Sequence, residues 1–216
     1  MKFITNILAP CFIASVIAPN AIAAVLIFKN DVGGGFANDN PVVANYGDNI
    51  ATAVQDGFSY GTTGGFTPDV LVSYSGEAIY NSDYGDLGSV VYATGPTLTI
   101  TFTATVGTVS LDSFDMAAFT GSPNQTIPTI TVSNGLTTYA QTGLVAPVAG
   151  RSSVNFTGNP SAAAGATVTL TIAGAENGLS GFSNFQFSQI PEPASGGLLG
   201  MGALALMIRR RQRVLR

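Results

Sequence analysis

The sequence predicts an all-β protein built as an antiparallel β-sandwich. Thr97 to Val106 alternates threonine with apolar residues at every position, which is typical of a strand with one buried and one exposed face. Thr167 to Ile172 alternates in the same way. The region between the two ends of the chain has no long helical period, and turn residues separate its short apolar runs. These features favour a sandwich of short strands over any helical fold.

Residues 1–23 are predicted to be a signal peptide. Lys2 supplies one positive charge, Ile4 to Ile17 is mostly apolar, and Ala21-Ile22-Ala23 places small residues where a signal peptidase reads them. We therefore expect cleavage before Ala24. Cys11 is the single cysteine of the chain, and the apolar region continues beyond it, which argues against a lipoprotein signal. The exported chain has no thiol and needs no disulfide chemistry.

The ectodomain, residues 24–190, is strongly acidic. It contains two basic side chains, Lys29 and Arg151, and eleven acidic ones, which makes its net charge −9 although the whole chain has −4. A domain this acidic is not expected to bind nucleic acid or an anionic membrane surface. The chain has no histidine, which excludes a Ser-His-Asp triad and a histidine metal site. We therefore predict no catalytic residues.

The start of the ectodomain combines an apolar run with a glycine- and Asx-rich segment. Ala24 to Phe28 is a plausible first strand, and Asn30 to Asn40 is expected to be a loop. The loop lacks the Gly-Lys-Ser/Thr ending of a phosphate-binding loop. Its oxygen-rich residues, Asp31 and Asp39 among them, could hold calcium, although their spacing is not that of an EF-hand. Plain turn chemistry is the alternative interpretation.

Residues 46–92 hold six of the seven tyrosines and show little strand-like alternation. We expect short strands with long loops there. Exposed aromatic rings beside carboxylates and amides are typical of sugar-binding surfaces. The candidate glycan contacts are Tyr60, Tyr74, Tyr80 and Tyr84. The alternative is that these tyrosines cover the edge of the core.

The second half of the ectodomain supplies further short strands. The alternating pattern shifts phase between Leu111 and Phe114, which predicts a β-bulge or a strand end. Strands are expected at 127–132 and 136–141, joined by a turn at 133–135, and at 153–156. Three phenylalanines close the domain, namely Phe182, Phe185 and Phe187.

Residues 191–216 combine three ordered features at the end of the chain. Pro191-Glu192-Pro193 is followed by fifteen uncharged residues, Ala194 to Ile208, and then by the basic Arg209-Arg210-Arg211-Gln212-Arg213. As a helix the apolar segment would rise about 22 Å, against a hydrocarbon core of about 30 Å, so it is a marginal single transmembrane helix. The arginines are expected to stay on the cytoplasmic side. An ordinary C-terminal membrane anchor is one interpretation.

The order of these features resembles the PEP-CTERM sorting signal, a bacterial tail processed by the membrane protease exosortase. The residues that carry the resemblance are Pro191, Glu192 and Pro193, the apolar segment, and Arg209, Arg210 and Arg211. The resemblance implies a Gram-negative bacterium with an exopolysaccharide matrix. It also implies transient anchoring in the inner membrane, removal of the tail, and delivery to the outer surface or beyond.

The ectodomain also resembles the galactose-binding-like jelly rolls that often precede this tail. The resemblance rests on Thr97 to Phe119 and on Gly178 to Phe187. Those modules often end on a strand that contains a small residue, an asparagine and an aromatic residue, as in Ser183-Asn184-Phe185. It favours a jelly roll over an immunoglobulin-like topology. It further implies one structural Ca²⁺ near the first and last strands, for which Asp31 or Asp39 and Asn184 are the candidates.

These observations leave three functions open. The first is a non-catalytic module associated with exopolysaccharide in a biofilm, with exosortase and signal peptidase as processing partners. The second is a structural matrix protein with no specific ligand. The third is a glycoside-active enzyme, since two carboxyl groups about 5–10 Å apart suffice for that chemistry. Eleven acids make such a pair easy to obtain by chance, so we do not expect an enzyme.

Overall fold

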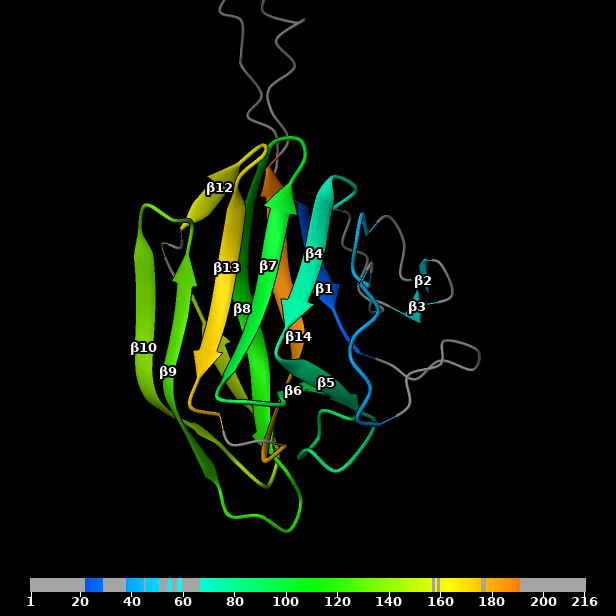
Figure 1. Ribbon diagram of the computed structural model, residues 1–216, viewed down its shortest axis with the longest axis vertical. Coiled ribbons are helices and arrows are strands. Elements are labelled where there is room, and N and C mark those ends of the chain that lie inside the picture. The colour runs from blue at the N-terminus through cyan, green and yellow to red at the C-terminus, as the bar shows by residue number, and fades with distance from the viewer. Residues whose placement is uncertain are drawn as a thin grey trace, which may run out of the picture.

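Two antiparallel sheets pack face to face and form a sandwich (Figure 1). The computed structural model describes residues 22–28, 38–44, 46–50, 54–55, 58–59, 67–156, 158, 160–175 and 178–190. No helix occurs within these ranges. The chain crosses between the sheets several times, as in a jelly roll, so the predicted antiparallel sandwich is confirmed.

The front sheet in Figure 1 has five strands, all paired antiparallel. Their spatial order is β10 (Thr138–Ala146), β9 (Gln125–Ser133), β13 (Thr167–Ala173), β7 (Thr97–Ala104) and β4 (Val70–Ser75). Strands β7 and β13, and β9 from Thr129 onward, alternate buried apolar and more exposed residues, because only one face of this sheet meets the core.

The second sheet has seven strands and lies behind the first. Its main order is β11 (Ser152–Asn155), β8 (Thr108–Ala118), β14 (Ser180–Ile190), β6 (Val90–Ala93) and β5 (Glu77–Tyr80). Two short strands complete it, with β1 (Ile22–Leu26) paired to β14 and β12 (Ser161–Ala163) paired to β8. A separate two-stranded hairpin is formed by β2 (Val54–Gln55) and β3 (Phe58–Ser59).

The core lies between the sheets and is rich in phenylalanine. Phe102 of β7 and Phe187 of β14 meet across the sandwich with ring centroids 4.9 Å apart. Phe114 of β8 stacks on Phe185 of β14 at 5.4 Å. All four rings are fully buried. The Phe102–Phe187 contact joins the two sheets, the Phe114–Phe185 contact lies within the seven-stranded sheet, and the closing phenylalanines predicted from the sequence form the centre of the core.

The predicted irregularity between Leu111 and Phe114 is confirmed as a β-bulge in the β8–β14 pairing. Strand β8 does not end there, but its register with β14 shifts between Ser183 and Gln186 and again between Gln186 and Phe187. The inward-facing pattern changes phase because Asp112 and Ser113 both lie partly exposed. The bulge therefore lets β8 stay paired over its whole length.

Several strand ends differ from the prediction, including those of β9, β10 and β11, and two of the differences change the burial of a side chain. Strand β7 stops at Ala104, so Val106 lies in the following turn and is 47% exposed instead of facing the core. The β9–β10 turn is longer than expected and includes Leu136, which is 93% exposed. Asn134 stabilises this longer turn, because its Oδ1 accepts hydrogen bonds from the backbone N–H of Leu136 at 3.0 Å and of Thr137 at 2.8 Å.

The first and last described strands lie side by side, with Ile22 opposite Gln189. The predicted cleavage point before Ala24 lies inside β1, whose Ala24 and Leu26 side chains are buried. Within the described residues no helix has the length and apolarity needed to cross a bilayer. The predicted apolar segment 194–208, the sorting residues around it and the rest of the signal peptide lie outside these residues.

Replacing Phe114 by alanine is expected to lower the free energy of unfolding by about 3–5 kcal/mol, because it opens a cavity where three other phenylalanines meet. Chemical denaturation of the purified protein measures this. Leu136→Ala, at an exposed turn position, is the control and should change stability by less than about 0.5 kcal/mol. Equal effects of the two substitutions would contradict the assignment of the core.

Candidate polar site beside the β14 bulge

The bulge in β14 places Asn184 in a left-handed backbone conformation, with φ 54°. Asparagine tolerates this conformation better than most residues because its short amide causes little steric conflict. The Asn184 side chain leaves the core and donates a hydrogen bond from Nδ2 to Asp115 Oδ2 at 2.7 Å. The same bulge that preserves the β8–β14 pairing therefore exposes an amide next to a carboxylate.

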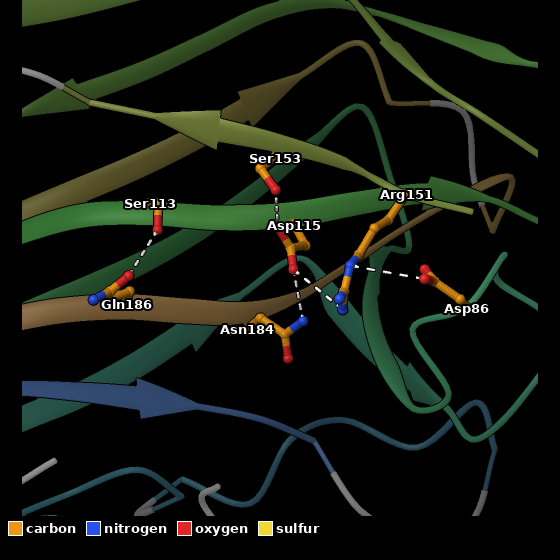
Figure 2. Close-up of polar contacts among 7 residues, drawn as sticks. All are labelled: Asp86, Ser113, Asp115, Arg151, Ser153, Asn184 and Gln186. Carbon is orange, nitrogen blue, oxygen red and sulfur yellow. Dashed lines mark hydrogen bonds and ion pairs between the residues drawn. The ribbon is translucent and has the colours of Figure 1, made fainter. Parts of the chain in front are cut away.

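Asp115 is the centre of a group of polar side chains on the outer side of the seven-stranded sheet (Figure 2). Its Oδ1 accepts a hydrogen bond from Ser153 Oγ at 2.6 Å, and its Oδ2 lies 3.5 Å from a guanidinium nitrogen of Arg151. Arg151 also lies 3.8 Å from the Asp86 carboxylate. We call these five residues, Asp86, Asp115, Arg151, Ser153 and Asn184, the polar row.

Exposure differs along the polar row. The Asp115 side chain is 16% exposed, whereas those of Arg151 and Asp86 are 44% and 55% exposed. Ion pairs as exposed as Arg151–Asp86 contribute little to stability. Arg151 is the one basic side chain among the described residues. It therefore offers a positively charged donor on a surface that is otherwise acidic.

A cavity of about 490 Å³ adjoins the polar row at Asn184. Its lining is mainly amides, hydroxyls and glycine, with apolar side chains on one side: Ile27, Phe28, Asn81, Leu87, Gly88, Ser89, Ser183 and Asn184. A second cavity, of about 320 Å³, lies at the other sheet beside Tyr139 and Asn134. The first cavity has no charged residue in its lining but has the polar row at its side. That combination suits a neutral ligand with many hydroxyl groups.

The tyrosines predicted as glycan contacts mostly serve the core. Tyr84 is 1% exposed, and its hydroxyl donates to the Gly178 carbonyl at 2.6 Å. Its ring lies directly on Gly181, where an added Cβ would come within 2.6 Å of the ring. The prediction is therefore wrong for Tyr84, which has no ring face available to a sugar.

The other three candidate tyrosines have different positions. Tyr74 is half-buried, and its hydroxyl donates to the Tyr46 carbonyl at 2.8 Å. Tyr80 is half-buried against Tyr84, with ring centroids 5.9 Å apart. Tyr60 lies outside the described residues. Glycan contact by Tyr60, Tyr74 and Tyr80 stays a prediction.

The described calcium candidates, Asp39 and Asn184, have different hydrogen-bond partners. The Asp39 carboxylate accepts a hydrogen bond from the Tyr92 hydroxyl at 2.7 Å, whereas the Asn184 amide is held by Asp115. Asp31 lies outside the described residues, within which no group of three or more acidic side chains could hold a metal ion. Because Ca²⁺ takes six to eight oxygen ligands, Asp39 and Asn184 do not make a site by themselves. Calcium binding stays a prediction.

Sequence reasoning missed most of the polar row. Asp115, Arg151 and Ser153 were not predicted as site residues, and Asn184 was predicted only as a calcium ligand. One signal was available, since Arg151 is one of two basic residues in the ectodomain. Nothing in the sequence showed that it faces Asp115, because 36 positions separate the two residues.

Comparison with protein families gives a match at the C-terminal end of the chain. Residues 189–211 match the profile of the PEP-CTERM protein-sorting motif. The chain carries a PEP-CTERM sorting signal. This PEP-CTERM motif implies export across the inner membrane and processing by exosortase. The matched region begins at Gln189, one residue before the end of β14, so it overlaps the last strand of the folded domain.

Similarity in the rest of the chain is low. The comparison with curated proteins gave no significant match. Among solved structures, TmCBM61 in complex with β-1,4-galactotriose matches with a TM-score of 0.33 and 10% identity. The match covers 56% of this chain and 88% of that chain. Similarity at this level establishes neither a shared fold nor a shared ligand.

Burial raises the pKa of Tyr92 to about 12, and its hydrogen bond to the Asp39 carboxylate adds to the effect. The unfolded tyrosine loses its proton near pH 10, so the free energy of unfolding should fall as pH rises from about 10 to 12. The Tyr92 contribution is on the order of 2 kcal/mol. Tyr92→Phe should make the decline shallower, which urea denaturation at pH 8 to 12 measures. An identical decline in both proteins would contradict this assignment.

Proposed function

We propose that this exported PEP-CTERM protein is a non-catalytic, glycan-associated module of an exopolysaccharide matrix. Its sorting signal supports delivery to the cell surface, where a polysaccharide is an abundant partner. The observation that carries the glycan assignment is the cavity at Asn184 together with the polar row beside it. The polar row lies on the outer side of the seven-stranded sheet, and Asn184 belongs both to it and to the cavity lining.

The chemistry of this site matches a sugar chain. Amide and hydroxyl groups of Asn184 and Ser89 can donate to and accept from ring hydroxyls, and Leu87 offers an apolar surface for the carbon side of a ring. Arg151 is 44% exposed and adds a charge-assisted donor. It would favour polymers that carry carboxylate or sulfate groups, which the acidic remainder of the surface would repel.

The described carboxylates support a non-catalytic role. Asp115 is occupied by a serine, an amide and a guanidinium group. Burial raises the pKa of Asp48 and of Glu77, as a general acid would require. The Asp48 carboxylate, however, accepts a hydrogen bond from the backbone of Val72, and backbone hydrogen bonds hold Glu77 as well. Neither residue lines the cavity, so both serve the fold.

One observation favours a structural matrix role as a second candidate. The five strands of the front sheet contain no charged residue, and their outer face is rich in threonine. Such a face suits repeated weak contacts with other matrix components. The two roles are compatible, because the cavity and this face lie on opposite sheets.

Removal of residues 209–216, which contain the terminal arginines, should prevent normal sorting. We expect the truncated protein to change from a surface or extracellular form to a form retained elsewhere in the cell. Fractionation followed by mass spectrometry of intact protein measures this and locates both ends of the mature chain. Recovery of the unaltered wild-type protein from the cell surface with its arginines attached would contradict processing of the tail.

Asn184→Gly should abolish retardation of the protein in gels that contain the producing strain's own exopolysaccharide. Glycine accepts the left-handed backbone and removes only the amide, so the fold should be preserved. Arg151→Ala should weaken the retardation about tenfold on an acidic polymer and less on a neutral one. The wild-type protein is expected to be retarded measurably.

Thr131→Ala, on the outer face of the other sheet, is the matched control and should be retarded like the wild-type protein. Retardation of Asn184→Gly equal to that of the wild-type protein would exclude this site. An absence of retardation for the wild-type protein would favour the purely structural role.

A further inference from the structure

The distribution of charge over the two sheets is uneven. None of the residues in the five strands of one sheet, β4, β7, β9, β10 and β13, is charged. In the other sheet a single strand, β8, already carries two charged residues, Asp112 and Asp115. The ectodomain as a whole has a net charge of −9. Two copies of the protein therefore repel each other over most orientations, but not when their five-stranded sheets come together.

The outer face of the five-stranded sheet is a regular array of hydroxyl groups. Antiparallel pairing places Thr101, Thr169, Ser133 and Thr138 in one row that crosses four strands. Thr99, Thr171 and Thr131 form the next row. Threonine favours extended backbone and keeps this face soluble without charge. The face thus adds no electrostatic barrier to association.

The two edge strands of this sheet, β4 and β10, differ in the hydrogen-bond partners of their outward backbone groups. Along β4 the edge is occupied, because the Asp48 carboxylate accepts from the backbone N–H of Val72 at 2.6 Å and the Asn49 N–H donates to the Val70 carbonyl at 2.8 Å. The Asp48 side chain is half-buried, so this cover is partly withdrawn from solvent. At the opposite edge, no strand of the described chain pairs with the free side of β10.

Strand β10 lacks the features that usually protect an exposed edge. Natural edge strands carry lysine, proline or inward-facing charges, or are very short. β10 has nine residues and contains neither a charge nor a proline. Gly143, with φ 65°, interrupts the extended backbone, so the regular part of the edge runs from Thr138 to Thr142. Val145 beyond it is 45% exposed.

We propose that β10 is a self-association edge, at which a second copy of this chain adds its own β10 in antiparallel orientation about a two-fold axis centred near Ala140. Such pairing satisfies the free backbone groups of both edges and joins two uncharged five-stranded sheets into one. A second copy fits better than a charged peptide, because the edge and the face beside it offer no charge to recognise. The proposal does not depend on glycan binding, which involves the other sheet.

Sedimentation velocity over a range of concentrations tests the proposal on the exported, naturally processed protein. We expect the wild type to show a monomer–dimer equilibrium. Ala140→Lys places like charges opposite each other across the axis and should raise the dissociation constant at least tenfold. Thr171→Lys adds the same charge to the same face on the central strand β13 and is the matched control, with a dissociation constant close to that of the wild type.

A cross-link provides a second measurement that does not rely on weakening the protein. The natural cysteine lies in the predicted signal peptide, so Ala140→Cys creates a single thiol in the processed chain. Paired residues across antiparallel strands have Cβ atoms about 4.5–5.5 Å apart, near enough for a disulfide after small adjustments. We expect Ala140→Cys to form a covalent dimer under mild oxidation, and Thr171→Cys to remain monomeric.

Four results would overturn the proposal, and the first three concern the edge strand directly. These three are a wild-type protein that stays monomeric at every concentration, an Ala140→Lys variant that is folded and dimerises like the wild type, and equal cross-linking of the two cysteine variants. Loss of dimers in both lysine variants would also overturn it, because that result would assign association to the face of the sheet and not to its edge.

Discussion

The structure depends on the packing of β14 inside the sandwich. This strand pairs with β8, β6 and β1, and its phenylalanines meet those of β7 and β8 in the centre of the core. Loss of this strand would separate the two sheets and expose the largest apolar side chains of the domain. Other features, including the bulge and the site beside it, follow from the need to keep β14 paired on both sides.

The candidate site is a consequence of that constraint. Strands β8 and β14 both change phase near Asp112 and Gln186, and the bulge absorbs the mismatch. A bulge interrupts the regular alternation of a strand and thereby points one side chain in a new direction. Here the side chain is Asn184, which links the cavity to Asp115 and, through it, to Arg151. A packing requirement of the core has thereby produced a polar site on the surface.

The position of the sorting signal also follows from β14. The PEP-CTERM motif begins at Gln189, which is 2% exposed and donates to the Val106 carbonyl at 2.9 Å. The folded domain therefore holds the first residues of its own sorting signal. The strands of the five-stranded sheet contain no charged residue, whereas β8 and β5 of the seven-stranded sheet carry Asp112, Asp115 and Glu77. An acidic protein that must stay soluble and still associate in a matrix can use such a separation.

The sequence by itself determined the strand-forming segments, the sandwich class and the sorting tail. Alternation in Thr97 to Ala104 and Thr167 to Ala173 is a local property of one strand that faces the core on one side, so it can be recognised without the partner strand. The order of proline, apolar and arginine residues in the tail is equally local. The tertiary structure alone decided that Tyr84 is buried on Gly181 and that Asp115, Arg151, Ser153 and Asn184 meet. Those contacts join residues that are 36 to 97 positions apart, and their formation depends on strand order and register, which no single segment encodes.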